Sequence, residues 1–586
     1  MENLVNITIN GVAYQVEAGS TILEACRQVH IDIPTLCYLK DINEIGACRM
    51  CLVEVEGMRT LQAACVYPVR EGMVIKTNTN RVREARKMNL ELILSNHERS
   101  CFQCAKNNHC ELRTLAGKMG ITDIRFDIET PNREKEYSSP SIVRNNNKCI
   151  LCRRCVAVCK HIQKVEAIEV TNRGFNTEIT HAFSIPTIDS NCILCGQCVQ
   201  VCPTGALREV RNIDQVWDAI NDPTKYVVVQ VAPAVRAGLG EEFGYPIGTE
   251  IQGKMVNALR KLGFDNVFDV ITGADFTIME EGTELLHRVQ NGGVLPMITS
   301  CSPGWVKFCE HFFPEFIPNL STAKSPHMMF GATLKGYYAP KINVDPKDMV
   351  VVSVMPCVAK KFEASRPEFV VDGNKDVDIV ITTKELAAMI KEACINFTEL
   401  EDENWDNPFT KVTGSGAIFG ATGGVMEAAL RTVAETLAGR PLDSVDFHEI
   451  RGKTGIKEIV VNAGGVQLKG CVCSGVGNAK TILEYIREKG ESEYQFIEVM
   501  ACPGGCVMGG GQPIVDPLTK EKVDVFHKRA SVLYNIDRKA TVRKSHENPD
   551  IIKVYQEFYG EPNSHVAHKY LHTSYTPRGK FREENK

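Results

Sequence analysis

Alternating apolar and polar residues predict a small β-rich unit at the start of the chain. Residues 5–19, VNITINGVAYQVEAG, alternate in this way, and Asn10-Gly11 falls where two short strands would turn into a hairpin. STILEACRQVH follows and predicts a helix, with Ser20 as its N-cap and Glu24 in its first turn. Residues 81–97, RVREARKMNLELILSNH, predict a charged amphipathic connecting helix.

The pattern changes at about residue 211, where apolar β-branched runs begin to alternate with helical segments. The runs are YVVVQVAPAV at 226–235, MVVVSVMP at 349–356 and VDIVITT at 377–383, and the last leads into the helical pattern TKELAAMIKEA. Such alternation is typical of α/β layers with buried, mainly parallel strands. We therefore expect a multidomain chain in which small α+β units precede a large α/β unit.

Size and charge exclude some classes of protein. A chain of 586 residues is too long for one core. A net charge of -5 gives no bulk reason to expect nucleic acid or an anionic membrane as a partner. The start, MENLVNITING, lacks the basic and apolar regions of an export signal, and no apolar run reaches the roughly 18 residues of a membrane span.

Cysteine is the unusual feature, with 24 residues. In a large chain without an export signal, this number indicates metal or redox chemistry rather than disulfides. The first group contains a tight C-x2-C pair and suits either a [2Fe–2S] cluster, which we favour, or zinc. Its members are Cys37, Cys48, Cys51 and Cys65.

The second group combines one imidazole with three thiols, in HERSCFQCAKNNHC. Such a set can hold a structural zinc or a [4Fe–4S] cluster. Between two iron–sulfur units we favour the cluster. Its members are His97, Cys101, Cys104 and Cys110.

Two copies of C-x2-C-x2-C-x3-C give the strongest local signal, CILCRRCVAVC at 149–159 and CILCGQCVQVC at 192–202. In this two-cluster pattern the fourth cysteine of each run binds the other cluster. We therefore assign one [4Fe–4S] cluster to Cys149, Cys152, Cys155 and Cys202, and another to Cys192, Cys195, Cys198 and Cys159. Pro203 follows the second run as the pattern asks, whereas Lys160 follows the first. Clusters in series suggest a wire to a further redox site.

Three later segments place cysteine in loops that contain Gly or Pro, where the backbone can approach a ligand closely. They are TSCSPGW at 299–305, MPCVAKKFE at 355–363 and EVMACPGGCVMGGGQP at 498–513. The remaining cysteines are expected to be small buried side chains: Cys26, Cys309, Cys394, Cys471 and Cys473.

These three segments resemble the signature motifs of [FeFe]-hydrogenases, TSCCPxW, MPCxxKxxE and ExMACxxGCxxGGGxP. The second and third match at every specified position, and the N-terminal order of clusters resembles the large clostridial monomeric members. The resemblance extends to about residue 575. It implies a [2Fe–2S] domain at 1–80, a one-histidine, three-cysteine [4Fe–4S] domain at 81–140, a two-cluster domain at 141–210, a catalytic domain at 211–515 and a small-subunit-like segment at 516–575. The last residues, GKFREENK, predict a disordered tail at 576–586.

The resemblance also implies an H-cluster, in which a [4Fe–4S] cubane shares one cysteine with a di-iron unit that carries CO, CN⁻ and a dithiolate. Cys357, Cys502 and Cys506 match cubane ligands, and Cys506 would be the bridge. Lys360 and Pro233 match positions beside the cyanides, and Met355, Phe419 and Met500 match apolar walls. The proton relay of the family maps onto Cys301, Glu281, Ser321, Glu284 and Arg288. From the residues alone, Glu281 and Glu284 would also fit a solvated helix face.

Two positions depart from the family pattern. The first motif has two adjacent cysteines, a relay thiol and then a cubane ligand, and here the pair is Cys301-Ser302. Either Ser302 takes the fourth cubane position as a harder, more basic ligand, or Cys301 swings in and the relay loses its thiol. His327 stands where close relatives carry Gln.

We therefore predict an enzyme that interconverts protons, electrons and H2. Ferredoxin or flavodoxin is the expected electron partner, along with H-cluster maturation proteins, in a monomeric cytoplasmic protein. The alternatives are a low-activity or sensory variant, because of Ser302, and an electron-transfer subunit that resembles the large iron–sulfur subunit of NADH dehydrogenases. No G-x-G-x-x-G follows a predicted strand, so no nicotinamide site is expected.

Overall fold

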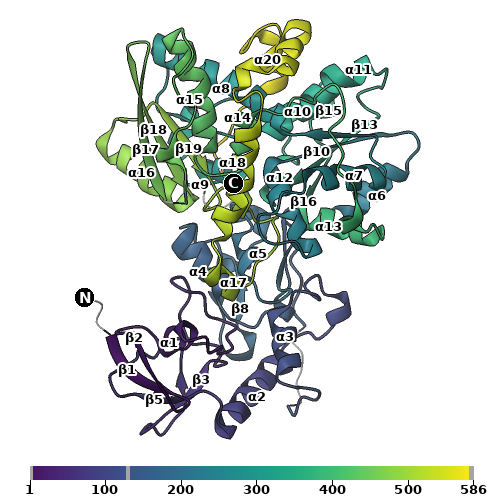
Figure 1. Ribbon diagram of the computed structural model, residues 1–586. Helices are drawn as coiled ribbons and strands as arrows, with labels where there is room; N and C mark the ends of the chain where they lie inside the picture. The colour runs from purple at the N-terminus through teal and green to yellow at the C-terminus, as the bar shows by residue number, and fades with distance from the viewer. Residues whose placement is uncertain (1–3, 127–131, 454, 580–586) are drawn as a thin grey trace.

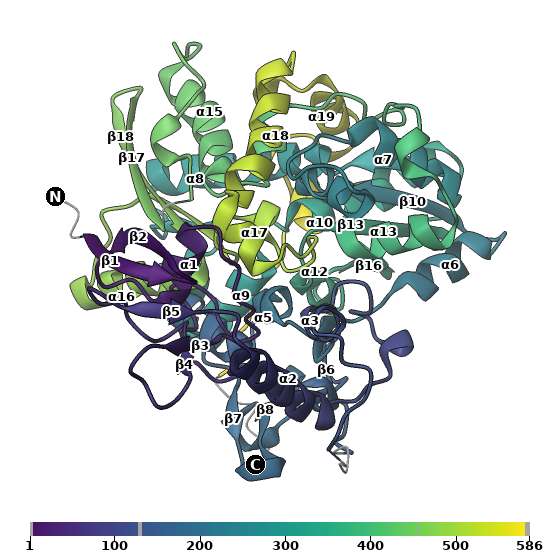
Figure 2. The ribbon, with the colours of Figure 1, turned by 60° about the horizontal axis from the view of Figure 1, so that its bottom comes forward.

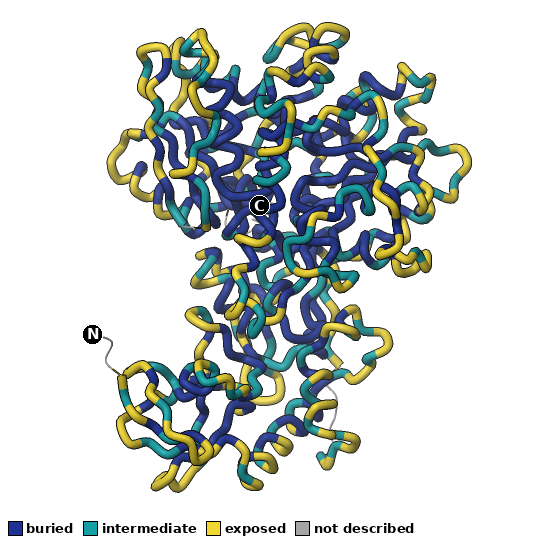
Figure 3. The backbone as a smooth tube through the Cα atoms, viewed as in Figure 1, coloured by how far each residue is buried: buried dark blue, intermediate teal, exposed yellow. Residues whose placement is uncertain are grey.

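The computed structural model describes residues 4–126, 132–453 and 455–579. A small N-terminal part lies below a larger lobe that contains most of the second half of the chain (Figure 1). Buried backbone is concentrated in the middle of that lobe (Figure 3). Within the described residues, no helix combines the length and apolar character needed to cross a bilayer.

The N-terminal part is built on a five-stranded sheet with the order β2-β1-β5-β3-β4. The predicted hairpin is confirmed, because β1 (Leu4–Ile9) and β2 (Val12–Glu17) pair antiparallel around Asn10 and Gly11, both with positive φ. The other strands are β3 (Leu52–Val55), β4 (Gln62–Ala63) and β5 (Val74–Lys76).

Helix α1 (Ile22–Gln28) begins one residue later than predicted, so Ser20 as N-cap is wrong. Thr21 is the N-cap, because Glu24 lies three residues after it and the two close a capping box. The hydroxyl of Thr21 accepts from the N–H of Glu24 at 3.2 Å, and the carboxylate of Glu24 accepts from the N–H of Thr21 at 2.9 Å.

The middle of the chain consists of short elements around cysteine loops. The predicted connecting helix is α2 (Asn80–Ser95), and α3 (Glu111–Lys118) follows it. The two cysteine repeats contain α4 (Arg154–Ala157) and α5 (Gln197–Val201). Two small antiparallel ribbons join these segments, β6 (Ile142–Arg144) with β9 (Leu207–Glu209), and β7 (Glu169–Thr171) with β8 (Glu178–Thr180).

The large lobe confirms the α/β prediction with two four-stranded sheets. The first has the order β11-β10-β13-β16 and is parallel throughout: β10 (Tyr226–Val231), β11 (Asn266–Asp269), β13 (Met349–Met355) and β16 (Ile379–Thr382). The second has the order β12-β19-β18-β17, and only β17 runs antiparallel: β12 (Met297–Ile298), β17 (Ile456–Ala463), β18 (Val466–Ser474) and β19 (Phe496–Met500).

Helices cover both sheets, which lie on opposite sides of the lobe (Figure 1). The longest is α8, which carries the predicted relay glutamates. The α-helices of this lobe are α6 (Ile213–Asn221), α7 (Gln252–Leu262), α8 (Ile271–Asn291), α9 (Pro303–Phe312), α10 (Pro326–Thr333), α11 (Ala339–Lys341), α12 (Ala359–Glu363), α13 (Thr383–Glu392), α14 (Gly414–Ile418), α15 (Gly424–Ala438) and α16 (Val476–Lys489).

The C-terminal segment packs back onto this lobe as α17 (Pro517–Lys522), α18 (Val525–Lys539), α19 (Pro549–Val554) and α20 (His565–Leu571). Near the end, Arg578 donates to the carboxylate of Glu310 at 2.5 Å. Of the tail predicted at 576–586, residues 580–586 lie outside the described residues.

The cysteine repeats meet the large lobe through a close backbone contact. Helix α5 lies at the junction of the two parts (Figure 1) and beneath α12 in the turned view (Figure 2). The side-chain amide of Gln200 donates to the carbonyls of Gly510 at 3.0 Å and Gln512 at 2.8 Å. A Cβ on Gly510 would lie 2.6 Å from the carbonyl oxygen of Cys195 and 2.9 Å from Cα of Gly196. Only glycine fits there.

Replacing Gly510 by alanine should therefore destabilise the protein, because neither contacted backbone atom can move aside cheaply. Overpacking of this kind costs about 1–3 kcal/mol, so the thermal midpoint followed by circular dichroism should fall. Gly117→Ala is the matched control, since nothing lies within 4 Å of a Cβ there. An unchanged midpoint in Gly510→Ala would show that the contact is looser than described.

Candidate functional site

Strand ends from both sheets meet around one cavity of about 860 Å³. Parallel strands that share a direction bring their carboxyl ends to one edge, where α/β proteins place their sites. Cys301 follows β12, Cys357 follows β13, and Cys502 follows β19, while Cys506 begins a short 3-10 helix, Cys506–Met508. All four cysteines line the cavity.

The rest of the cavity wall is largely apolar. The predicted wall residues Pro233, Met355, Phe419 and Met500 all line it, and so does Ser302. Ala274, on α8, also contributes to the wall and had no signal in the sequence. Burial raises the pKa of the Cys506 thiol to about 12, and burial raises the pKa values of Cys301, Cys357 and Cys502 too. Thiols buried in an apolar cavity ionise when their sulfur coordinates a metal. This set of donors therefore fits an iron–sulfur group.

One buried cation faces this cavity. The ammonium of Lys360 donates to the carbonyl of Cys301 at 3.0 Å and to Oε2 of Glu363 at 2.7 Å. Nε2 of His327, which also lines the cavity, lies 2.7 Å from the same Oε2. Burial acts to raise the pKa of Glu363, but Lys360 and His327 outweigh it and hold this pKa at about 2. The cavity thus has one polar corner built around an ionised carboxylate.

Ser302 is the N-cap of α9, and its Oγ accepts a hydrogen bond from the N–H of Ala501 at 3.2 Å. Its neighbour Cys301 lines the same wall. Both residues of the unusual pair therefore face the cavity.

Three of the predicted relay residues, Ser321, Glu284 and Arg288, are joined by hydrogen bonds. Glu281 is fully buried on α8, and its Oε1 accepts from the N–H of Ser300 at 3.4 Å. Ser321 donates to Oε2 of Glu284 at 2.9 Å, and Arg288 donates to the other oxygen at 2.6 Å. The solvated helix face considered for Glu281 is thereby excluded.

Burial, reinforced by the charge of Glu284, raises the pKa of Glu281 to about 8, and the hydrogen bond from the N–H of Ser300 opposes the rise. Its Oε2 has no hydrogen-bond partner among the described residues. A neutral carboxyl with a free oxygen can both give and accept a proton.

The two cysteine repeats form two separate cavities in the pairing that the spacing predicts. Cys149, Cys152, Cys155 and Cys202 line one, while Cys159, Cys192, Cys195 and Cys198 line the other. Cys195 also lines the large cavity. The second repeat site and the large cavity therefore share a wall.

The first cysteine group is also assembled. Sγ of Cys51 lies 3.3 Å from Sγ of Cys65. Hydrogen bonds from Cys48 and Cys65 lower the pKa of Cys37 to about 2. The buried amide of Asn43, which the sequence did not single out, donates to the carbonyl of Cys37 at 2.7 Å and to that of Cys152 at 3.0 Å. One side chain thus joins the first site to the first repeat.

The histidine site is less complete. His97, Cys101 and Cys110 line one cavity. The lining residues in the described part of the chain do not include Cys104, whose Sγ would lie 2.4 Å from a Cβ on Gly205. Burial lowers the pKa of His97 to about 4, and Nδ1 is buried without a hydrogen-bond partner in the described chain. A neutral ring with a free nitrogen fits a metal ligand.

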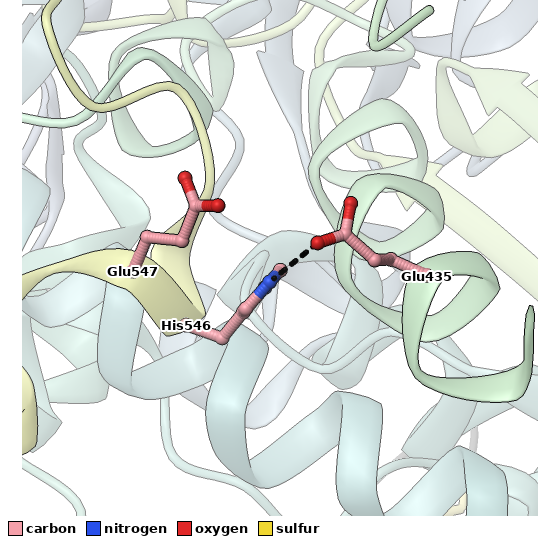
Figure 4. A group of neighbouring side chains, drawn as sticks. All are labelled: Glu435, His546 and Glu547. Atoms are coloured by element: carbon pink, nitrogen blue, oxygen red, sulfur yellow. Dashed lines mark hydrogen bonds and ion pairs between the residues drawn. The ribbon is translucent and has the colours of Figure 1, made fainter. Parts of the chain in front are cut away.

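Among the other cysteines, Cys26, Cys309, Cys471 and Cys473 are buried as expected, but Cys394 is exposed and that prediction is wrong. It follows α13 in a left-handed conformation, with φ of 53°, at a surface turn. Two further groups among the described residues could offer metal ligands. In one, Glu427, Asp446 and Asp537 pair with Arg431 and Arg543, and the other consists of Glu435, His546 and Glu547 (Figure 4). Lys544 forms ion pairs with both carboxylates, so this group already has its cation.

Family models match most of the chain. The model described as iron only hydrogenase large subunit, C-terminal domain, matches residues 225–510, and that for the iron hydrogenase small subunit matches 523–578. Upstream matches are a 2Fe-2S iron–sulfur cluster binding domain at 2–80, the iron–sulfur binding region of NADH-ubiquinone oxidoreductase-G at 86–125 and a 4Fe-4S dicluster domain at 148–206.

Individual relatives agree with these models. The chain is 48% identical to the NADP-reducing hydrogenase subunit HndD of Solidesulfovibrio fructosivorans, over 98% of this chain and 99% of that one. It is 45% identical to iron hydrogenase 1 of Clostridium pasteurianum, over 97% and 99%. A solved variant of [FeFe]-hydrogenase HydA1 from Chlamydomonas reinhardtii is 43% identical, with a TM-score of 0.56 over 63% of this chain and 100% of that one.

The raised pKa of Glu281 gives a direct prediction. Its carboxyl should stay neutral at neutral pH and ionise only as the pH rises through about 8. An infrared carbonyl band of a protonated carboxyl should be lost above this pH in the wild type and be missing from Glu281→Gln. Asp275→Asn is the matched control, because burial raises the pKa of Asp275 to about 7, so a different band should disappear. A wild-type spectrum identical to that of Glu281→Gln at pH near 7 would contradict the prediction.

Proposed function

Because this chain belongs to the iron-only hydrogenase family, we propose that its large cavity holds an H-cluster and that four accessory clusters supply it with electrons. The enzyme interconverts protons, electrons and H2, and its iron–sulfur domains relay the electrons. The observation that carries the site assignment is the convergence of four cysteines, three of them from distant strand ends, on one apolar cavity that shares Cys195 with an accessory site. The reading as an electron-transfer subunit does not account for residues 225–510.

When bound, the H-cluster supplies the iron on which H2 is formed or split. Cys357, Cys502 and Cys506 would hold it, and Lys360 would place a cation against its anionic ligands. The apolar walls exclude water, which strengthens every charge interaction in the cavity. Ser302 or Cys301 would complete the ligand set.

Protons would move between the cavity and the surface along Cys301, Glu281, Ser321, Glu284 and Arg288. Two observations support this route. Ser321, Glu284 and Arg288 are joined by hydrogen bonds. The carboxyl of Glu281 is neutral and has one oxygen without a hydrogen-bond partner among the described residues. Arg288 holds the carboxylate of Glu284 in place through a hydrogen bond at 2.6 Å.

We assign one [2Fe–2S] cluster to the Cys37 group, [4Fe–4S] clusters to both repeat sites and a third [4Fe–4S] cluster to the His97 group. Cys104 would have to turn from Gly205 to join His97, Cys101 and Cys110. The Asn43 contact gives electrons a short covalent and hydrogen-bonded path from the first cluster to the first repeat.

Ferredoxin or flavodoxin is the proposed electron partner. One relative is named as a subunit of an NADP-reducing hydrogenase, so a partner subunit that binds the nucleotide is the second candidate. Thiolate ligands suit a reducing compartment, which favours a cytoplasmic monomer that receives its di-iron unit from maturation proteins.

The matured protein should show infrared bands from iron-bound CO and CN⁻, because the family's di-iron unit carries both ligands. Cys506→Ala should lose these bands, since it removes the bridging sulfur, whereas Cys394→Ala, at the exposed turn, should keep them. Matured protein without such bands would contradict the assignment of the cavity.

Ser302→Cys should raise the rate of H2 formation, because a thiolate is the softer ligand and restores the fourth sulfur. The rate should be compared at equal iron content. Ser365→Cys, at an exposed position outside the cavity, is the control. Equal rates for wild type and Ser302→Cys would show that serine does not limit the enzyme and would remove the reason to consider a low-activity or sensory variant.

A further inference from the structure

A second hydrogen-bonded chain meets the proposed relay at Glu284. The N–H of Thr322 donates to Oε2 of Glu284 at 3.1 Å, and Oγ1 of Thr322 lies 3.4 Å from the same oxygen. That Oγ1 lies 2.8 Å from Nδ1 of His572, and Nε2 of His572 lies 2.9 Å from Oε2 of Glu280. The chain from Glu284 to Glu280 is therefore continuous.

Glu280 at the far end is fully buried and surrounded by hydrogen-bond donors. They are the hydroxyl of Tyr555, the N–H of Asn563 at 2.7 Å, the side-chain amide of Asn563 at 2.8 Å and the ring of His572. All four contacts end on its carboxylate oxygens, which accept, so Nε2 of His572 carries the hydrogen in this contact.

This tautomer gives the chain a direction. Because Nε2 carries the hydrogen, Nδ1 presents a lone pair and accepts from the hydroxyl of Thr322. The remaining lone pairs of that hydroxyl are free to accept from Glu284 when Glu284 is protonated. A proton on Glu284 can then pass to Oγ1 of Thr322 while Thr322 gives its own proton to Nδ1. The product is an imidazolium beside the charge of Glu280, an arrangement that stabilises it.

We propose that Thr322, His572 and Glu280 form a proton-accepting arm of the relay, which stores one proton next to Glu284. The proposal rests on the relay described above and extends it, since each H2 requires two protons and the relay passes them singly. The arm would return its proton when Glu284 has given its own inward. It therefore matters most when protons are scarce in solution.

The groups around His572 are consistent with storage of a proton on its imidazole ring. Exposed His568 stacks on its ring with centroids 4.1 Å apart, which places the buried imidazole one ring from solvent. The charged and titratable groups that face the arm are Glu280, Glu284, Arg288, Tyr555 and His568.

Anchoring the C-terminal segment does not require this imidazole. The N–H of Thr573 donates to the carbonyl of Thr322 at 2.8 Å, and that of Lys324 donates to the carbonyl of Leu571 at 2.8 Å. Backbone pairing thus holds the two segments together whatever side chain occupies position 572. A substitution there can test proton storage with little loss of structure.

The test compares His572→Gln, which keeps hydrogen-bonding groups but cannot hold a proton, with the wild type in H2 formation across pH. We expect rates within about twofold at about pH 6 and a loss of about three- to tenfold at about pH 8, since a positioned acid–base group contributes at least this much. Thr322→Val should reproduce the loss, and Thr322→Ser should restore the wild-type profile. His565→Gln, an exposed histidine at the start of α20, is the matched control.

A readout without turnover is the tautomer of His572, measured by histidine-selective 15N NMR on protein made without maturation. Hydrogen on Nε2 supports the arm, and hydrogen on Nδ1 overturns it, because Thr322 could then no longer donate to the ring. A pH profile unchanged in His572→Gln, with Ser321→Ala inactive, overturns the arm and leaves the relay in place. Full activity in Ser321→Ala overturns the relay and the arm with it. A lower thermal midpoint with an unchanged pH profile would assign His572 a structural role and also overturn the arm.

Discussion

The geometry of parallel strands governs this molecule. Sulfurs that are about 200 residues apart, at Cys301 and Cys502, must reach one cavity. Neighbouring parallel strands all end at the same edge, so each loop that leaves a strand begins close to the others. Two such sheets lie on opposite sides of the lobe, and β12, β13 and β19 are each followed by a cysteine within three residues of the strand's last residue. The backbone hydrogen bonds of the sheets fix the positions of these loops before any ligand binds.

Burial gives the assembled cavity its chemistry, and nearby cations decide where its effect on pKa is overcome. It raises the pKa of Cys506 and of Glu281, because each would have to become charged in a dry place. Glu363 escapes this effect only because Lys360 and His327 both contact its carboxylate. A neutral acid and an ionised acid therefore coexist around one cavity, and what separates them is the presence of a cation at hydrogen-bonding distance.

Local spacing predicted much of the fold and the cysteine sites, and its limits have physical causes. The repeat cysteines line two cavities in the predicted grouping, because one short motif fixes four positions of the chain. The cap of α1 was misplaced by one residue because Ser20 and Thr21 have similar side chains, and only the partner Glu24 separates them. Cys394 was misjudged because burial of a lone cysteine depends on tertiary packing. Asn43, Thr322 and His572 could not be found, since their partners are distant in the chain and amide, hydroxyl and imidazole groups are common.

The amide of Asn43 has a mechanical consequence. Its two hydrogens belong to one rigid plane, and each is held by the carbonyl of a cysteine from a different domain. The two loops are thus held together by a pair of hydrogen bonds that share one planar group. A force applied to the N-terminal domain, as when another protein docks on it, reaches the loop of Cys152 without slack. In this enzyme, the contact between the first cysteine site and the first repeat site is therefore expected to be rigid.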